Sequence, residues 1–212
     1  MKKSQETSRR ILEAAFQRIA QRGCNQVTLR EIALEAGVAL SQLNYYYTNK
    51  ERLFSEVLRS MRQEYLANLE TRMRPCATLQ EKLACLVSYN RQLLATNREL
   101  YGAFLEFFNL AMWSASFRIE MNQFLDEIAA AIDRHIQGDA ARAPQAGAAP
   151  GGPGAPAGSG AATRLILGAS FGIAMQFLMD PAQEHLLDSF DALQALVAGT
   201  GRDGPAGPAT ST

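Results

Sequence analysis

Apolar residues recur along this chain at intervals of three and four positions, the spacing of one face of an α-helix. Two such stripes lie in the N-terminal third. The first contains Ile11, Leu12, Ala15, Phe16, Ile19 and Ala20, and the second contains Leu53, Phe54, Val57, Leu58, Met61, Tyr65, Leu69 and Met73. No segment of the sequence shows the sustained alternation of apolar and polar residues expected of a strand. The pattern therefore predicts an all-α fold.

Capping residues mark where the helices begin and end. A threonine followed three positions later by a glutamate fits the capping box, and the chain has four such pairs: Thr28–Glu31, Thr48–Glu51, Thr78–Glu81 and Thr96–Glu99. Asp180 before Pro181 also fits a helix start, and Gly23, Gly37 and Gly138 fit helix ends. Together these residues predict helices over 5–22, 28–36, 40–47, 50–73, 78–95, 97–111, 116–137, 161–179 and 182–198.

The amino-acid composition distinguishes two segments without predicted helix and one unusually apolar helix. Residues 139–162 are Ala, Gly or Pro at 20 of 24 positions, which favours a flexible loop, and residues 199–212 have the composition of a disordered tail. The longest apolar run, Leu165–Met179, has 15 residues, and a membrane span needs about 20. This run is therefore expected to form a buried helix and not a membrane span.

Charge and cysteine content narrow the function. The formal net charge is zero, but residues 1–74 carry 13 basic and 8 acidic side chains, an asymmetry typical of a chain that meets a polyanion at one end; chance is the alternative. The three cysteines indicate a reducing compartment. Cys24, Cys76 and Cys85 show no paired spacing and no signal peptide precedes them, which indicates free thiols in the cytoplasm. Cys24 is a structural residue or, alternatively, a redox sensor. His135 and His185 have no ligand partner at a metal-binding spacing, so no metal or other cofactor is expected.

The segment 28–54 has the pattern of a helix-turn-helix. Its first helix would bury Leu29, Ile32, Ala33 and Ala36, Gly37 permits a left-handed turn, and Leu43 would face inward from the second helix. Such a unit places its second helix in the major groove of DNA. Spacing alone also fits a helical hairpin that binds nothing.

Residues 5–54 resemble the DNA-binding domain of the TetR family. The matching features are the first helical stripe with Gly23, the Thr28 helix start, Ile32-Ala33, Ala36-Gly37-Val38, Leu43 with an aromatic cluster, and Lys50-Glu51 before Leu53-Phe54. The resemblance implies a three-helix DNA-binding domain over residues 1–49. It also implies a helical ligand-binding and dimerisation domain over residues 50–198.

The resemblance assigns DNA-binding roles to nine residues. Phosphate contacts are implied for Thr28, Tyr45 and Lys50, and a position at the groove edge for Arg30. The exposed face of the recognition helix would carry Leu40, Ser41, Gln42, Asn44 and Tyr46. Glutamine and asparagine side chains pair bidentately with adenine, whereas phosphate contacts set the register of the protein on the duplex.

This segment departs from the family pattern at several positions. Asn44 stands where tyrosine is usual, Tyr46 and Tyr47 where histidine and phenylalanine are common, and Leu40 where a polar residue is common. The recognition helix therefore carries no formal charge. These departures bear on the operator sequence and the set of base contacts and leave the expected fold unchanged.

The resemblance also implies a homodimer built from the last two helices of each subunit. Gly168 and Gly172 would permit close approach of another backbone, and the last helix has its own apolar face. That face contains Leu186, Leu187, Phe190, Leu193, Leu196 and Val197. Both features also fit an internal core. A dimer would match a palindromic operator.

A concentration of aromatic residues follows residue 100, where the resemblance implies a cavity for a small effector. The candidate lining residues are Tyr101, Phe104, Glu106, Phe107, Phe108, Asn109, Met112, Trp113, Phe117, Met121 and Gln176. Aromatic residues at helical spacing also form ordinary cores. Glu106 would neutralise a cationic effector if it faces inward, or be a surface charge if it faces outward.

These observations predict a cytoplasmic regulator that binds an operator in double-stranded DNA. It would be a repressor that a small apolar or cationic ligand releases by favouring the state that does not bind DNA. An activator with the same module remains an alternative, as does a helical interaction protein without DNA binding. The sequence contains no phosphate loop, no GxSxG motif, no metal-ligand set and no Cys–His pairing signal, so an enzyme is not expected.

Overall fold

The chain is helical throughout the residues that the computed structural model describes, which are 2–140 and 159–199. This part contains nine α-helices, a short 3-10 helix and no strand, so the all-α prediction is confirmed. The helices are α1 (Lys2–Arg22), α2 (Leu29–Glu35), α3 (Leu40–Tyr46), α4 (Lys50–Met73), α5 (Leu79–Thr96), α6 (Arg98–Trp113), α7 (Ala115–Ala140), α8 (Ser159–Met179), η1 (Glu184–Leu187) and α9 (Asp188–Gly199). Most of the predicted loop (139–162) and tail (199–212) lies outside the described residues, over 141–158 and 200–212. Residues 139–140, 159–162 and 199 are helical, which corrects the predicted bounds of the loop and the tail.

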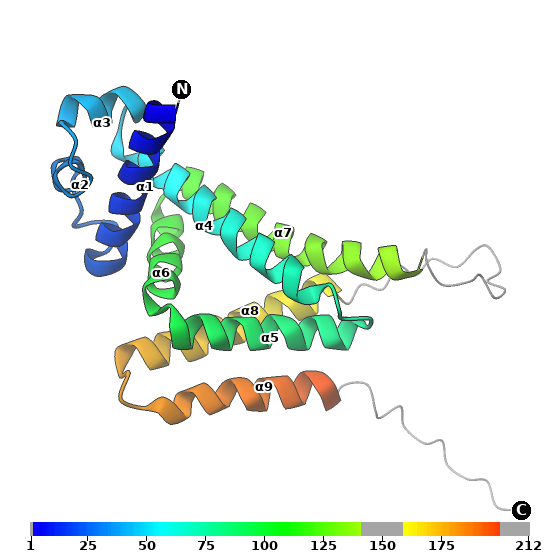
Figure 1. Cartoon of the computed structure of the whole chain (residues 1–212). Helices are drawn as coiled ribbons and strands as arrows, with labels where there is room; N and C mark the ends of the chain where they lie inside the picture. The colour runs from blue at the N-terminus through cyan, green and yellow to red at the C-terminus, as the bar shows by residue number, and fades with distance from the viewer. Residues whose placement is uncertain (1, 141–158, 200–212) are drawn as a thin grey trace, which may run out of the picture.

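Helices α1, α2 and α3 form an N-terminal unit at one end of the molecule (Figure 1). The first apolar stripe supplies its centre, because Ile11, Ala15 and Ile19 are completely buried, as are Ile32 of α2 and Leu43 of α3. Helix α1 also contacts α4 and α6, which belong to the body of the molecule. Helix α1 therefore packs within the N-terminal unit and also joins that unit to the body.

Helix α4 leaves the N-terminal unit and runs beside α7, while α5 packs against α8 and α9 (Figure 1). The second apolar stripe is buried along the whole of α4. Polar bonds also tie α4 to α7: Arg62 donates to Glu127 at 2.7 Å, Arg134 to Glu70 at 3.0 Å, and Ser55 to Glu120. Helices α4 and α7 are therefore held together by side-chain hydrogen bonds as well as by apolar packing, and the pair extends from the N-terminal unit into the body.

Two of the four predicted capping boxes are confirmed and two are misplaced by one residue. Thr28 and Thr78 each cap a helix with the predicted glutamate. In contrast, α4 is capped by Asn49, which accepts from the amide of Arg52, and α6 by Asn97, which accepts from the amide of Leu100. In both cases an asparagine stands directly after the threonine, and its side-chain oxygen is an equally good cap.

The glycine signals are confirmed at two of three positions. Gly23 and Gly37 have φ of 77° and 61°, a left-handed conformation that terminates a helix and favours glycine. Gly138 was expected to end a helix, and this prediction is wrong because α7 continues to Ala140. A glycine inside a helix weakens it without necessarily ending it.

The predicted helix start at Asp180-Pro181 is also wrong. The amide of Gln183 donates to the Asp180 carbonyl at 3.1 Å, and the Gln183 side chain donates to the Asp180 carboxylate at 2.6 Å. These bonds close a turn in which Pro181 takes the second position, where proline is favoured. The chain then passes through η1, and α9 begins only at Asp188.

Helix α8 is only partly buried, which corrects the expectation of a buried helix. Leu165, Met175 and Met179 are exposed, whereas Ile166, Leu167, Ala174 and Phe177 face the interior. Over Gly160–Met179 the helix is long and apolar enough to cross a membrane by length and composition, and about 33% of its most apolar window is buried. Length and composition do not separate a span from a core helix, and α8 packs against α5, α6 and α7.

Candidate nucleic-acid interface and aromatic core

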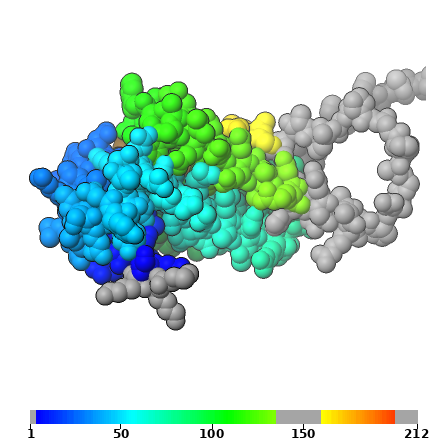
Figure 2. Space-filling view, turned by 90° about the horizontal axis from the view of Figure 1, so that it is seen from above, coloured from blue at the N-terminus to red at the C-terminus, as the bar shows by residue number. Residues whose placement is uncertain are grey.

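The short helix α3 has distinct inner and outer faces. Leu43 is buried, whereas Ser41, Gln42 and Asn44 are exposed and Tyr45 is 83% exposed. Leu40 is half-buried and packs against the core at the start of the helix. Figure 2 shows the N-terminal unit at one end of the molecule. The arrangement brings four polar side chains together on a protruding helix surface.

Tyr46 and Tyr47 attach α3 to α1. The Tyr46 hydroxyl donates to Ser4 Oγ at 3.1 Å, and the Tyr47 and Ser8 hydroxyls are hydrogen-bonded at 2.8 Å. The Tyr46 ring lies edge-on to that of Tyr45, with 5.5 Å between their centroids. Tyr46 was predicted on the exposed face, but it is half-buried and its hydroxyl is engaged. The two tyrosines therefore fix the orientation of the outer face of α3.

Thr28 and Glu31 fix the start of α2. The Thr28 amide and hydroxyl both donate to Glu31 Oε2 at 2.8 Å, and the Glu31 amide donates to Thr28 Oγ1 at 3.3 Å. The Thr28 hydroxyl and amide lower the pKa of Glu31. Arg30 is exposed on the same first turn. A phosphate contact by Thr28 stays a prediction, because its hydroxyl already acts as the cap.

Arginines of α1 hold the helix-turn-helix in place. Arg22 pairs with Glu31 at 2.6 Å, Arg18 pairs with Glu35, and Arg10 donates to the carbonyls of Ala36 and Gly37 in the turn. These guanidinium groups therefore stabilise the geometry of the turn. Part of the positive charge of the N-terminal unit is thus paired within the unit itself.

Lys50 occupies the first position of α4, which the Asn49 side chain caps. The Lys50 ammonium lies 5.2 Å from the centroid of the Phe54 ring, one helical turn further along. A lysine at a helix N-terminus adds its charge to unpaired backbone N–H groups, a combination that attracts anions. The side chain is half-buried, and the Phe54 ring supports its stem.

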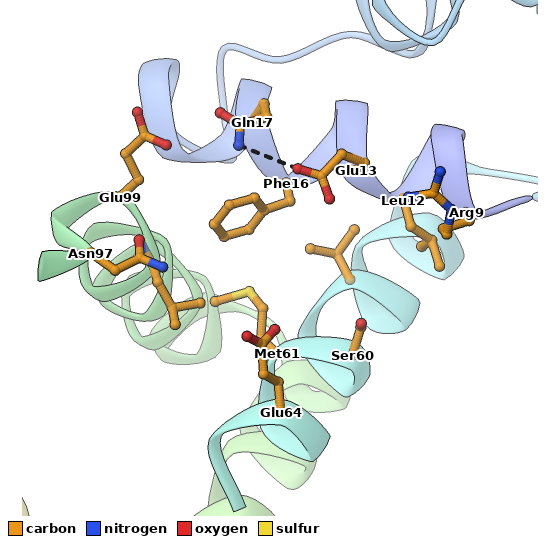
Figure 3. Close-up of a pocket in the computed structure, with 12 residues that line it drawn as sticks. Arg9, Leu12, Glu13, Phe16, Gln17, Ser60, Met61, Glu64, Asn97 and Glu99 are labelled. Atoms are coloured by element: carbon orange, nitrogen blue, oxygen red, sulfur yellow. Dashed lines mark hydrogen bonds between the residues drawn. The ribbon is translucent and has the colours of Figure 1, made fainter. Parts of the chain in front are cut away.

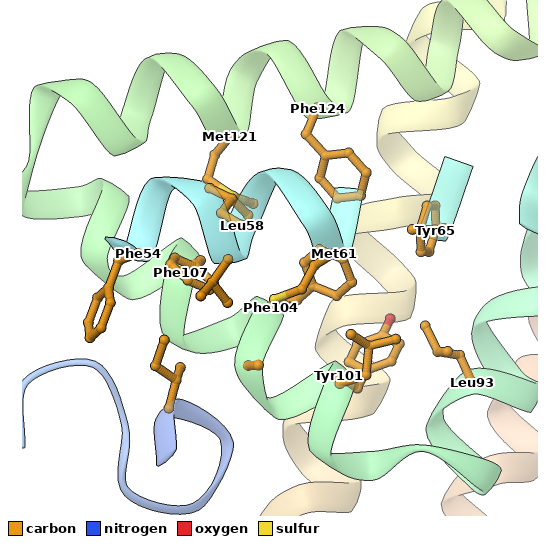
Figure 4. Close-up of a cluster of buried hydrophobic side chains, with 14 of the residues drawn as sticks. Phe54, Leu58, Met61, Tyr65, Leu93, Tyr101, Phe104, Phe107, Met121 and Phe124 are labelled. Atoms are coloured by element: carbon orange, nitrogen blue, oxygen red, sulfur yellow. The ribbon is translucent and has the colours of Figure 1, made fainter. Parts of the chain in front are cut away.

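The predicted aromatic residues of α6 and α7 meet in the core of the body (Figure 4). Phe104 and Phe124 stack with 5.2 Å between their centroids, and the Tyr65 ring lies edge-on to both. A cavity of about 10 Å³ remains beside them, which is room for roughly one water molecule. Tyr101, Phe107, Phe117 and Met121 are also buried. The structure therefore shows a packed aromatic core where the sequence predicted an effector cavity.

Asn90 and Tyr65 are central to this core, and sequence reasoning did not identify either as a site residue. The Asn90 amide donates to the Leu86 carbonyl at 2.8 Å and to the Tyr65 hydroxyl at 3.1 Å, while the Tyr101 hydroxyl donates to Asn90 Oδ1 at 3.3 Å. Burial raises the pKa of both tyrosines. An asparagine at an inward position of an apolar helix was the available signal, since buried polar groups need partners.

Several candidate effector residues lie away from the aromatic core. Asn109, Met112 and Trp113 are exposed at the end of α6, with Trp113 at 85%, and Gln176 donates to the Gly172 carbonyl of its own helix at 3.2 Å. Phe108 is half-buried against Phe171. The exposed four residues are therefore corrected from cavity lining to surface positions.

Glu106 faces the N-terminal unit and not the aromatic core. Its Oε2 accepts a hydrogen bond from the Cys24 amide at 2.9 Å. At Gly23, a Cβ atom would lie 2.8 Å from the same oxygen, so glycine permits the close approach as well as the positive φ. Glu106 therefore connects α6 directly to the turn between α1 and α2, and it is neither an inward counter-charge nor a free surface charge.

We expect Cys24 to be unreactive in the native protein. The thiol is buried, and burial followed by the Glu106 charge raises its pKa to about 12, so almost none of it is the reactive thiolate at neutral pH. Treatment with iodoacetamide at about pH 8, followed by peptide mass spectrometry, should leave Cys24 unmodified until denaturant is added. Rapid alkylation of Cys24 without denaturant would contradict this expectation and restore the redox-sensor alternative.

The described residues include no group of three His, Cys, Asp or Glu side chains placed to hold a metal ion. Fold and surface together define a class of protein: a helix-turn-helix unit that presents an exposed short helix and continues through its fourth helix into a helical body. Residues 11–57 match the sequence model described as bacterial regulatory proteins of the tetR family. The N-terminal unit therefore matches the DNA-binding region of the TetR family over residues 11–57.

Individual relatives agree with this assignment. The chain is 31% identical over 100 residues to the fatty acid metabolism regulator protein of Bacillus subtilis, a match that covers 47% of this chain and 52% of the relative. The chain thus spans about half the length of the curated relatives that it matches. These relatives are regulators.

Solved structures extend the similarity over the body. The regulator FadR of Bacillus subtilis in complex with stearoyl-CoA has a TM-score of 0.69 and 22% identity, and the match covers 90% of this chain and 97% of that one. A protein of Saccharomonospora viridis in complex with choline has a TM-score of 0.69 and 21% identity, with 89% and 95% covered. At this level of identity the similarity establishes the fold.

Proposed function

We propose that this protein is a bacterial transcriptional repressor that binds a palindromic DNA operator as a homodimer and is released by a small effector. The observation that carries the proposal is the exposed polar face of α3, on a unit whose sequence matches the DNA-binding region of the TetR family. A DNA operator would place the protein in the bacterial cytoplasm. The curated relatives are regulators as well, and an activator would use the same surface.

In this proposal the N-terminal unit divides its contacts between bases and backbone. Gln42 and Asn44 are exposed on α3 and have the chemistry to pair with adenine in the major groove. Tyr45 on α3, Arg30 on α2 and Lys50 at the start of α4 would hold phosphates, with Ser41 as a further polar contact. Tyr46 and Thr28 would act mainly by orienting α3 and α2, because their hydroxyls are bonded within the unit.

The proposed dimer would form through α8 and α9. Leu165, Met175, Met179 and Leu196 are exposed apolar residues on these helices. A Cβ atom at Gly168 or Gly172 would have no neighbour within 4 Å, so a second backbone has room to approach. Exposed apolar surface of this kind is typical of an interface. Two joined subunits would present two copies of α3 to a palindrome.

The proposed effector would enter the aromatic core and change the position of α4. Aromatic rings and the Asn90–Tyr65–Tyr101 hydrogen bonds suit an apolar ligand with one polar group, or a cation held against ring faces. The structural relatives were solved with stearoyl-CoA, which carries a long apolar acyl chain, and with choline, a quaternary ammonium cation. Because α4 runs from this core to the N-terminal unit, opening the core would move α3 and weaken operator binding.

Selection of binding sites from a random duplex library tests the proposal. We expect wild-type protein to enrich a palindrome. Lys50→Ala should weaken all selected sites alike, because it removes a phosphate contact, and Gln42→Ala should relax particular positions at a cost of about 1–3 kcal/mol each. Folded, dimeric protein that enriches no sequence at low salt would overturn the proposal and favour a helical interaction protein.

A further inference from the structure

A cleft of about 380 Å³ opens between α1, α4 and the start of α6 (Figure 3). It is separate from the surface of α3 and from the exposed faces of α8 and α9, since none of those residues lines it. One wall belongs to the N-terminal unit and the others to the body. An occupant would therefore touch both parts of the molecule at once.

Part of the lining of this cleft is apolar, beside the polar side chains of Gln17, Ser60 and Asn97. Phe16 and Leu12 project from α1, and Met61 projects toward them from α4 (Figure 3). Val57 and Leu100 complete the apolar lining. Phe16 and Leu12 are only half-buried, although both pack against the core. These side chains leave apolar surface open to a ligand of moderate size.

The rim of the cleft is acidic. Glu13, Glu64 and Glu99 are all exposed, one from each wall. Within residues 2–140 and 159–199, no salt bridge involves any of the three, and Glu13 only accepts a 3.4 Å hydrogen bond from Gln17. The one basic lining residue, Arg9, pairs with Glu6 at 2.8 Å. Among the residues that line the cleft, carboxylates therefore outnumber basic side chains three to one.

We propose that this cleft is a second binding site, for a bulky apolar cation. The apolar part of the lining favours burial of hydrocarbon, and the excess of carboxylates at the rim attracts a positive charge and repels a negative one. The aromatic core is apolar as well, but its cavity is only about 10 Å³ and none of its lining residues is charged. The two sites therefore differ in size and in charge.

A ligand in this cleft would change the affinity of the protein for its operator, because of where the cleft lies. Helix α1 carries the N-terminal unit, and α4 carries the body, so a ligand between them biases their relative orientation. A ligand that favours one orientation changes operator affinity, and the operator changes the affinity of the ligand by the same factor. The binding itself requires no DNA, so it can be measured whether or not an operator is known.

Tetraphenylphosphonium and tetraphenylborate provide a matched pair of probes, because they share size and shape and differ in the sign of their charge. We expect isothermal titration calorimetry to detect binding of the cation and not of the anion. The double variant Glu64→Gln/Glu99→Gln should bind the cation about five- to tenfold more weakly, the effect of losing two exposed charges. Both residues are exposed, so the fold should be unaffected.

Two control variants test whether the cation binds in this cleft and not at another place on the protein. Glu184→Gln/Asp188→Asn removes two exposed carboxylates far along the chain and should leave cation binding unchanged. Phe104→Leu alters the aromatic core and should also leave it unchanged. Equal binding of the two probes, unchanged cation binding in the Glu64/Glu99 variant, or a loss confined to Phe104→Leu would each overturn the proposal.

Discussion

Replacing Leu43 by alanine should destabilise the N-terminal unit and abolish operator binding. Leu43 is the only residue within α3 that is fully buried, so it is the main apolar attachment of the recognition helix. Leucine-to-alanine changes at such positions cost about 2–5 kcal/mol, out of about 5–15 kcal/mol that stabilises a typical domain. Urea unfolding followed by circular dichroism would measure this loss.

Leu34→Ala is the matched control for this experiment. Leu34 lies on the neighbouring helix α2 and is 81% exposed, so the same chemical change there should alter the free energy of unfolding by less than about 0.5 kcal/mol. If the Leu43 variant unfolds at the wild-type urea concentration and binds DNA normally, α3 is not held in the way that the structure indicates.

Replacing Glu106 by alanine should loosen the attachment of the N-terminal unit to the body. The Cys24 amide would lose its acceptor, and an unsatisfied amide at a partly buried position costs about 1–3 kcal/mol. Calorimetry should then show the two parts melting less cooperatively than in the wild-type protein. Effector-induced release of DNA should also weaken, because α6 would no longer be bonded to the turn after α1.

Two substitutions on α6 make this prediction specific. Glu106→Gln keeps an oxygen that can accept from the Cys24 amide and should retain most of the coupling. Asn109→Ala removes an exposed polar side chain from the same helix and should change neither melting nor release. A Glu106→Ala protein with unaltered melting and unaltered response to its effector would show that the coupling runs elsewhere, for example through the contact of α1 with α4.

The N-terminal unit was predictable because its signals are local. Thr28 and Glu31 are three residues apart, Gly37 needs only its own backbone conformation, and the stripe of Ile11, Ala15 and Ile19 lies on one helix face. The same local reasoning failed where two residues compete for one role. Asn49 and Asn97 replaced the neighbouring threonines as caps, and sequence alone does not rank such neighbours.

The interior of the body was only partly predictable. Tyr101 and Phe104 were expected to be important because aromatic residues cluster in that stretch, but Tyr65 and Asn90 come from α4 and α5 and meet them only in the folded chain. Glu106 gave an ambiguous pattern for the same reason. The face of α6 that meets α1 depends on packing between helices that are distant in sequence.

The closed aromatic core affects the effector concentration at which the protein would respond. Because its cavity is only about 10 Å³, an effector that enters this core, as proposed, would have to bind a conformation in which the rings have separated. The apparent dissociation constant then equals the intrinsic one divided by the fraction of molecules that are open. If about one molecule in a hundred is open, a ligand with intrinsic nanomolar affinity acts at roughly a hundredfold higher concentration. The stacking of Phe104 on Phe124 would in this way set a threshold, so that trace amounts of effector leave the gene silent.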